Sequence, residues 1–159
     1  MRTIIKISVI CLTAIFFLSL TACDKSDKSD TTKPVITLIE PAEDDVLQIG
    51  SDVHFEAEFE DDEMLASYKV NIHPNFDDHS HAVTKSESET VDFEFDKSWT
   101  ISGKNAAIHH HDIVIPENAT PGHYHLMVYC IDAAGNESYI AVDIELSHDG
   151  EEHDHDEED

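Results

Sequence analysis

The sequence predicts an all-β fold, and three observations support this prediction. From Pro34 to Leu146, short segments alternate apolar and polar residues, a period of two that is typical of half-buried strands. These segments are rich in β-branched and aromatic residues, which favour strands. Turn-forming residues separate them, and no stretch of this region repeats its apolar residues with a convincing helical period.

Seven segments meet these criteria. In chain order they are VITLIE (35–40), VHFEAEFE (53–60), SYKVNIH (67–73), VDFEFDKSWTI (91–101), IHHHDIVI (108–115), HYHLMVYCI (123–131) and SYIAVDIEL (138–146). Seven strands in about 113 residues are typical of an immunoglobulin-like β-sandwich with antiparallel strands. We expect this domain to span residues 34–147.

The alternation also predicts which side chains form the core. The expected inward residues are Val53, Phe55, Ala57, Phe59, Tyr68, Val70, Ile72, Tyr124, Leu126, Val128 and Cys130. Cys130 is therefore expected to be a small core residue rather than a ligand. His123 and His125 take the alternate positions of the same strand and should point outward.

The first 23 residues predict export. They have a basic start, with Arg2 and Lys6, and an apolar run from Ile7 to Leu20 that is shorter than the ~20 residues needed to span a bilayer. The motif LTAC resembles the lipobox of bacterial lipoproteins, which implies a signal peptide over residues 1–22 and a lipid on Cys23. We expect a lipid-anchored protein of the cell envelope of a Gram-negative bacterium, in the outer rather than the inner membrane.

Charged segments flank the domain. Residues 23–33 lack apolar residues after Cys23 and predict a flexible tether. Residues 148–159, HDGEEHDHDEED, cannot form a core and predict a disordered acidic tail. Removal of the signal peptide leaves seven basic against 35 acidic residues, a formal charge of −28. This charge argues against nucleic acid and against direct adhesion to anionic lipid, and it favours cations as partners.

The twelve histidines predict a site for a divalent transition metal, with zinc as the first choice and copper and nickel as alternatives. Four pairs stand two residues apart, a spacing that puts two rings on one strand face. In the expected sandwich, strand 67–73 ends at the pole where strand 123–131 begins. The expected ligands there are His73, His79, His81, His123 and His125 with Asp78, and the tail residues His148, His153 and His155 are expected to bind weakly nearby.

The triplet His109–His111 fits this pole less well, because its strand should start at the opposite pole in the other sheet. Parity with Ile113 and Ile115 turns His109 and His111 toward the core, where an unpaired ring is costly. Two interpretations follow. Either the rings hydrogen-bond in pairs, or the segment bulges and brings His111 toward the other histidines as a further ligand.

The opposite pole offers a candidate calcium site. The segments EDDE and DAAGN follow two expected strands, and their loops are neighbours in the sandwich. Asp61, Asp62 and Asp132 would supply the hard oxygen ligands that calcium prefers. The alternative is that DAAGN is simply a turn in which Gly135 and Asn136 take unusual backbone angles.

Several motifs together resemble a known family. IPENATPGHYHLMVYCIDAAGNES is similar to the closing strands of bacterial immunoglobulin-like modules. With the lipobox, SYKVNIHPNFDDHSH, AAIHHHDIVIP and GHYH, the chain resembles the lipoproteins of domain of unknown function 4625 over roughly residues 33–146. The resemblance implies no activity. It implies that the family's pattern includes His73, Asp77, His79, His81, His109, His110, His111, His123 and His125.

The function that these observations favour is capture of a metal ion, by a lipid-anchored protein that buffers, scavenges or delivers it. Catalysis is not expected, because the sequence has no Gly-x-Ser-x-Gly elbow, phosphate loop or His-Glu-x-x-His motif. One alternative is an accessory binding or adhesion module for a protein or a glycan. The other is that the histidines are ordinary strand and surface residues and that the tail serves solubility.

Overall fold

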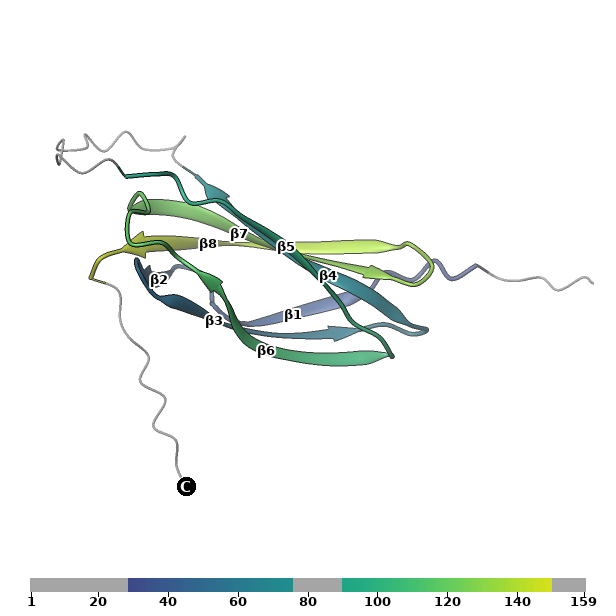
Figure 1. Cartoon of the computed structure of the whole chain (residues 1–159). Helices are drawn as coiled ribbons and strands as arrows, with labels where there is room; N and C mark the ends of the chain where they lie inside the picture. Colours follow the sequence, from purple (N-terminus) through teal and green to yellow (C-terminus); the bar gives the residue numbers. More distant parts are fainter. Residues whose placement is uncertain (1–28, 76–89, 150–159) are drawn as a thin grey trace, which may run out of the picture.

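The structure, a computed structural model, describes residues 29–75 and 90–149 (Figure 1). Within these residues the chain forms eight strands and no helix, which confirms the predicted all-β class. Consequently, this part of the chain contains no helix that could cross a membrane. Outside the described residues lie the expected signal peptide, Cys23, most of the tether, Asp77, Asp78, His79, His81, His153 and His155.

The strands form two sheets that pack as a β-sandwich (Figure 1). They are β1 (Val35–Glu40), β2 (Asp45–Gln48), β3 (Asp52–Glu60), β4 (Leu65–Pro74), β5 (Phe95–Thr100), β6 (Asn105–Val114), β7 (Gly122–Asp132) and β8 (Glu137–Ser147). One sheet has the order β1-β3-β6, and the other has the order β2-β8-β7-β4-β5. All neighbours pair antiparallel except β2, which runs parallel to β8.

All seven expected strands are present, with ends that differ by a few residues from the expected ones. The largest difference is in β5, which begins at Phe95 rather than Val91. The described residues add an eighth strand, β2, whose four residues are too few to show an alternating pattern. It forms because the chain crosses to the other sheet after β1, where Asp45–Gln48 pair with β8.

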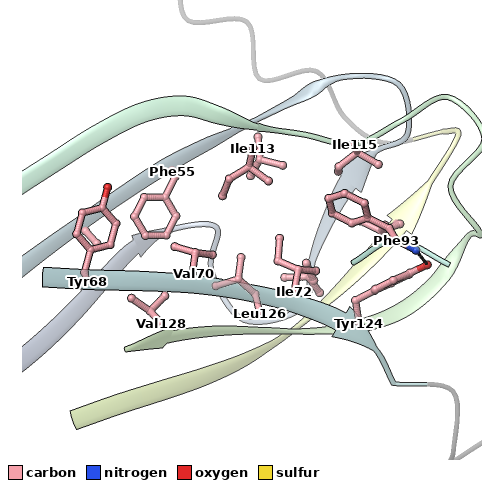
Figure 2. Packing of buried hydrophobic residues seen from close by; sticks show 14 of the residues in the cluster. Phe55, Tyr68, Val70, Ile72, Phe93, Ile113, Ile115, Tyr124, Leu126 and Val128 are labelled. Atoms are coloured by element: carbon pink, nitrogen blue, oxygen red, sulfur yellow. Dashed lines mark hydrogen bonds between the residues drawn. The ribbon is translucent and has the colours of Figure 1, made fainter. Parts of the chain in front are cut away.

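The core lies between the sheets, and all eleven residues that were expected to form it are buried. Figure 2 shows Phe55 and Ile113 of the three-stranded sheet facing Val70 and Ile72 of the five-stranded sheet. Cys130 is buried as expected, and burial raises the pKa of its thiol to about 11. Its thiol therefore belongs to the core.

A buried tyrosine fixes one end of the core. The Tyr124 hydroxyl donates a hydrogen bond to the carbonyl oxygen of Thr120, at 2.7 Å. It also accepts a hydrogen bond from the backbone N–H of Phe93, at 3.3 Å (Figure 2). Because Phe93 precedes β5 and Thr120 precedes β7, the hydroxyl joins two connecting segments that also pair through an isolated bridge between Val91 and Ala119.

A β-bulge in β6 changes the direction of the histidine triplet. Val53 pairs with Ile113 but Phe55 pairs with His110, so His111 and Asp112 of β6 oppose the single residue His54 of β3. The extra residue shifts the alternation before Ile113, and His109 and His111 are exposed while His110 is partly buried. The expectation from simple parity, with His109 and His111 on the core side, is therefore wrong, and the bulge is the physical reason.

Candidate metal centre

Three histidines gather on the outer face of the three-stranded sheet. His54 comes from β3, and His109 and His111 come from β6 on either side of the inward-facing His110. One ring nitrogen of each lies within 4.8 Å of a ring nitrogen of each other. The His54 ring centroid is 4.5 Å from that of His109 and 5.0 Å from that of His111.

Carboxylates surround these rings on the same face. Asp52 Oδ2 lies 2.7 Å from His111 Nδ1, and Glu40 Oε2 lies 3.5 Å from His54 Nδ1. Since a carboxylate oxygen can only accept, Nδ1 of His111 carries the proton, and Nε2 of the neutral ring keeps its lone pair for a metal. Glu56 Oε2 lies 4.0 Å from His54 Nε2 and adds a third negative charge beside the rings.

The geometry requires a small adjustment before the three rings can share an ion. Zinc binds imidazole nitrogen at about 2.0–2.1 Å, so nitrogens of a tetrahedral site stand about 3.3 Å apart. The nitrogens of this cluster lie within 4.8 Å of one another, and the rings of His54 and His109 are stacked rather than turned edge-on to a common centre. His109 and His111 are exposed, so their rings can rotate toward a common centre without moving the backbone.

His110, the middle residue of the triplet, has a structural role. Its Nδ1 accepts from the backbone N–H of Asp112 at 3.3 Å, so its Nε2 carries the proton and donates to the Tyr68 hydroxyl at 3.1 Å. The ring stacks against Trp99, with centroids 4.8 Å apart. Burial lowers the pKa of His110 against the opposing effect of Asp112. With both nitrogens occupied, His110 is unsuited to bind a metal.

The bulge also closes one side of the sandwich. Asp112 accepts hydrogen bonds from Lys97 Nζ at 2.8 Å and from Trp99 Nε1 at 3.1 Å, both on β5. These two hydrogen bonds lower the pKa of the Asp112 carboxyl. The β5 and β6 edges belong to different sheets, so the triplet segment joins the two layers while it presents two rings to solvent.

At the expected pole, the structure brings two of the predicted ligands together. His73 and His125 are cross-strand partners on β4 and β7, with ring centroids 5.4 Å apart. Nδ1 of His73 donates to Asn71 Oδ1 at 2.8 Å, and Nε2 of His125 lies 3.0 Å from Asp143 Oδ1. Each neutral ring thus keeps one free lone pair.

The other predicted ligands are more scattered. His123 is exposed two residues before His125, and the described part of the pole forms no cluster of three ligand atoms within 4.8 Å. His148 follows the end of β8, whose Leu146 pairs with Gly122 at the start of β7. His111 lies in the other sheet beside His54. The bulge that we considered is present, but it brings His111 to a different cluster.

The predicted calcium residues are only partly grouped. Asp61 and Asp62 form a cluster with Asp30, with carboxylate oxygens within 4.8 Å of one another. Asp132 is buried and accepts hydrogen bonds from the backbone N–H and side-chain Nδ2 of Asn136, at 2.7 and 2.6 Å. Although burial opposes it, these bonds lower the pKa of Asp132. Asp132 therefore stabilises the DAAGN turn, the alternative interpretation of this segment.

Two residues of these clusters, His54 and Asp30, were not predicted from the sequence. His54 is a single histidine between the inward Val53 and Phe55, so its outward direction could be read from the alternation. Its partners could be found only by pairing this strand with the triplet strand, which the sandwich topology allows. Asp30 lies in a segment without pattern, and no signal in the sequence singles it out.

Comparison with known proteins gives a family and no activity. A family model described as a domain of unknown function, DUF4625, matches residues 21–147. No curated protein matches the chain. A crystal structure of a DUF4466 family protein from Parabacteroides merdae ATCC 43184 is similar, with 13% sequence identity and a TM-score of 0.48. The similarity covers 75% of this chain and 46% of that one, so the chain spans less than half of that protein.

Proposed function

The chain belongs to the DUF4625 family, whose description assigns no activity, and we propose from its own residues that it captures a divalent transition metal in the cell envelope. The site is the histidine face, defined as His54, His109 and His111 on the outer side of the three-stranded sheet. The observation that carries the proposal is the approach of three imidazoles from two strands, with ring nitrogens within 4.8 Å.

The chemistry of the ligands favours zinc, with copper and nickel as competitors. Imidazole suits these ions, and three histidines with an open fourth position for water match common zinc sites. Asp52 orients His111 through Nδ1, which is the role that outer carboxylates take in zinc sites. The negative charge of Glu40, Asp52 and Glu56 beside the rings adds attraction for a cation.

The pole histidines and the tail would act as secondary binders. His73 and His125 are prearranged as a pair, and His123 on the same strand face can join them. In the proposed function, a lipid on Cys23 holds the domain at a membrane, and the strongly acidic chain attracts ions to it. Capture without chemical change fits a buffer, scavenger or delivery protein.

Titration with zinc tests this proposal. We expect His54→Ala and His109→Ala to weaken the tightest binding step of the full-length chain about 10-fold or more, since each removes one ligand. His111→Ala should weaken zinc binding as much as His54→Ala and His109→Ala do. Asp52→Asn should weaken it less, because it removes no ligand. The matched control is the double variant His73→Ala/His125→Ala, which removes two rings from the other sheet and should leave that step in place.

Two results would contradict the proposed site. If the tightest step survives in His54→Ala and His109→Ala but disappears in the pole variant, the specific site is the pole. If all these variants bind zinc like the parent chain, the folded domain holds no histidine site. Circular dichroism of each variant verifies that a loss of binding is not a loss of fold.

A further inference from the structure

We propose that Asp30, Asp61 and Asp62 form a calcium site that fastens the segment preceding β1 to the folded domain. These three residues are the acidic cluster. Asp61 and Asp62 lie in the turn after β3, and Asp30 comes from the segment before β1, about thirty residues earlier in the chain. Their carboxylate oxygens lie within 4.8 Å of one another.

Two carboxylate oxygens of this cluster are buried and have no hydrogen-bond partner among the described residues. Asp61 is only 8% exposed, and its Oδ1 accepts from the backbone N–H groups of Glu63 and Met64, at 3.0 and 2.6 Å. Its Oδ2 is buried and accepts no hydrogen bond from residues 29–75 or 90–149. Asp30 repeats this arrangement, because its Oδ1 accepts from the N–H of Thr32 at 2.9 Å and its Oδ2 is buried and unpartnered.

This pattern points to a cation. A buried carboxylate oxygen without a donor is unfavourable, and two in one cluster also repel each other. A bound cation removes both costs. The nearby ammonium group of Lys104 donates to the backbone carbonyl of Asp62, and no ion pair joins it to a carboxylate within the part of the chain that the structure describes.

Calcium fits these ligands better than the ions proposed for the histidine face. All the donors are carboxylate oxygens, the hard ligands that calcium takes in sets of about 6–8 at 2.3–2.6 Å, with water and carbonyl oxygens completing the shell. Zinc and copper prefer nitrogen and sulfur ligands, and magnesium demands a near-ideal octahedron that separate loops rarely supply. The two sites therefore discriminate between two classes of metal.

The surroundings show what the ion would hold together. Asn136 Nδ2 donates to the backbone oxygen of Asp30 at 3.2 Å and to Asp132 Oδ2 at 2.6 Å. The segment before β1 thus already touches the turn between β7 and β8, at the end of the sandwich where β3 also ends (Figure 1). Calcium would add the turn after β3 to this contact.

The position of Asp30 near Cys23 would let the calcium site hold the domain close to the membrane. This consequence rests on the lipid anchor of the proposed function. Asp30 stands seven residues after Cys23, a stretch that reaches at most about 25 Å when fully extended. A chain fastened at Asp30 would keep this end of the sandwich close to the membrane. Calcium would then set the height and orientation of the domain, independently of any metal on the histidine face.

Thermal unfolding of the full-length chain tests the site, with calcium chloride, magnesium chloride or zinc chloride as the probe. Modules outside the cytoplasm bind calcium with dissociation constants of about 10⁻⁴–10⁻³ M, so about 5 mM calcium should raise the Tm by several degrees. We expect Asp30→Asn, Asp61→Asn and Asp62→Asn each to abolish this increase. Asp61→Asn and Asp30→Asn keep Oδ1 as an acceptor for the backbone N–H groups, so the turns remain intact.

Two controls complete the test. Asp44→Asn removes one exposed charge from another loop and should leave the calcium effect unchanged. Hydrogen exchange of the Thr32 amide should slow with calcium in the parent chain and not in Asp62→Asn. The proposal is overturned if calcium shifts neither Tm nor exchange, if the shift persists in all three variants of the cluster, or if magnesium produces it equally well. Zinc bound at the histidine face would itself raise the Tm, so zinc is compared through the Thr32 amide, and equal slowing of its exchange by zinc would also overturn the proposal.

Discussion

The ring of His54 stacks on the ring of His109, with centroids 4.5 Å apart, although 54 residues separate the two side chains in the chain. The contact exists because β3 pairs with β6, where His109 lies opposite Glu56 and diagonally across from His54. His111 lies on the same outer face by regular alternation, and the bulge that follows it turns Ile113 inward. A metal bound by these rings would therefore join two neighbouring strands and stabilise their pairing.

We expect metal binding by the histidine face to weaken as the pH falls. Imidazole binds a metal only when it is neutral, and histidine titrates near ~6.5 in model peptides, so affinity for zinc should decline below about pH 6. Calcium binding by the acidic cluster should persist at about pH 5, because carboxylic acids of model peptides titrate near ~4. Calorimetric titration at about pH 7.5 and 5 measures both. Equal zinc affinity at the two values would count against histidine ligands.

Deletion of residues 148–159 should change how many ions bind rather than how tightly the first one binds. The composition of the tail predicts disorder, and a disordered segment must lose conformational entropy for each ion that it organises, whereas strand-held rings are already positioned. Zinc titration of the truncated chain should show fewer ions per chain and an unchanged tightest step. A variant with His148, His153 and His155 replaced by Asn separates the contribution of the rings from that of the acidic groups. Loss of the tightest step on truncation would assign that step to the tail.

The alternation of apolar residues was enough to predict the sandwich and its core. Val53, Phe55 and their alternate neighbours are buried as expected, because one face of each strand must leave water. The direction of His109 and His111 could not be predicted in this way. Counting alternate residues back from Ile113 gives the direction of a side chain only while the strand is regular. One extra residue in β6 reverses the direction of the residues before it.

The ligand clusters were harder to predict than the strands, because they depend on register and on loop positions. His73 and His125 pair because β4 and β7 are neighbours, and the sequence predicted that both lie at this pole. To predict that His54 joins His109 and His111, the register of β3 against β6 had to be known. Asp30 depends on where a segment without secondary structure lies against the domain, which no periodic pattern encodes.

Replacement of Cys23 should release the protein from membranes. A lipid on this residue is the anchor in the proposed function, and Cys23→Ser removes the acylated sulfur. After cell fractionation, the parent chain should sediment with membranes and the variant should not. Cys11→Ser is the matched control, because Cys11 belongs to the expected signal peptide and its loss should leave sedimentation unchanged. A Cys23→Ser protein that still sediments with membranes would refute the lipoprotein assignment.

Tyr124→Phe should destabilise the domain without changing its metal sites. The substitution removes the hydroxyl that donates to the Thr120 carbonyl and accepts from the Phe93 N–H, so both backbone groups lose this partner. We expect a loss of about 1–3 kcal/mol in the free energy of unfolding. Tyr139→Phe, at a residue that is 62% exposed, should change it by less than about 0.5 kcal/mol. Urea unfolding of both variants measures the difference, and equal midpoints would contradict a structural role for the Tyr124 hydroxyl.

Cys130 should make the fold less stable at high pH. Burial raises the pKa of its thiol from 9.0 to about 11 in the folded chain, with Asp61 and Asp132 adding to the effect. The unfolded chain therefore loses this proton first as the pH rises, and stability falls between about pH 9 and 11. From about pH 8 to 10.5 the loss due to this group amounts to roughly 2 kcal/mol.

Urea unfolding of the parent chain and of Cys130→Ala over this pH range isolates the thiol. The variant should start less stable, because it loses a buried sulfur, and the gap between the two chains should narrow as the pH rises. Other groups that titrate in this range are common to both chains and cancel in the comparison. The folded parent should also resist iodoacetamide at Cys130 at about pH 8, because its thiolate fraction there is on the order of 10⁻³. A constant gap between the two chains, or rapid alkylation of Cys130 in the folded protein, would contradict the raised pKa.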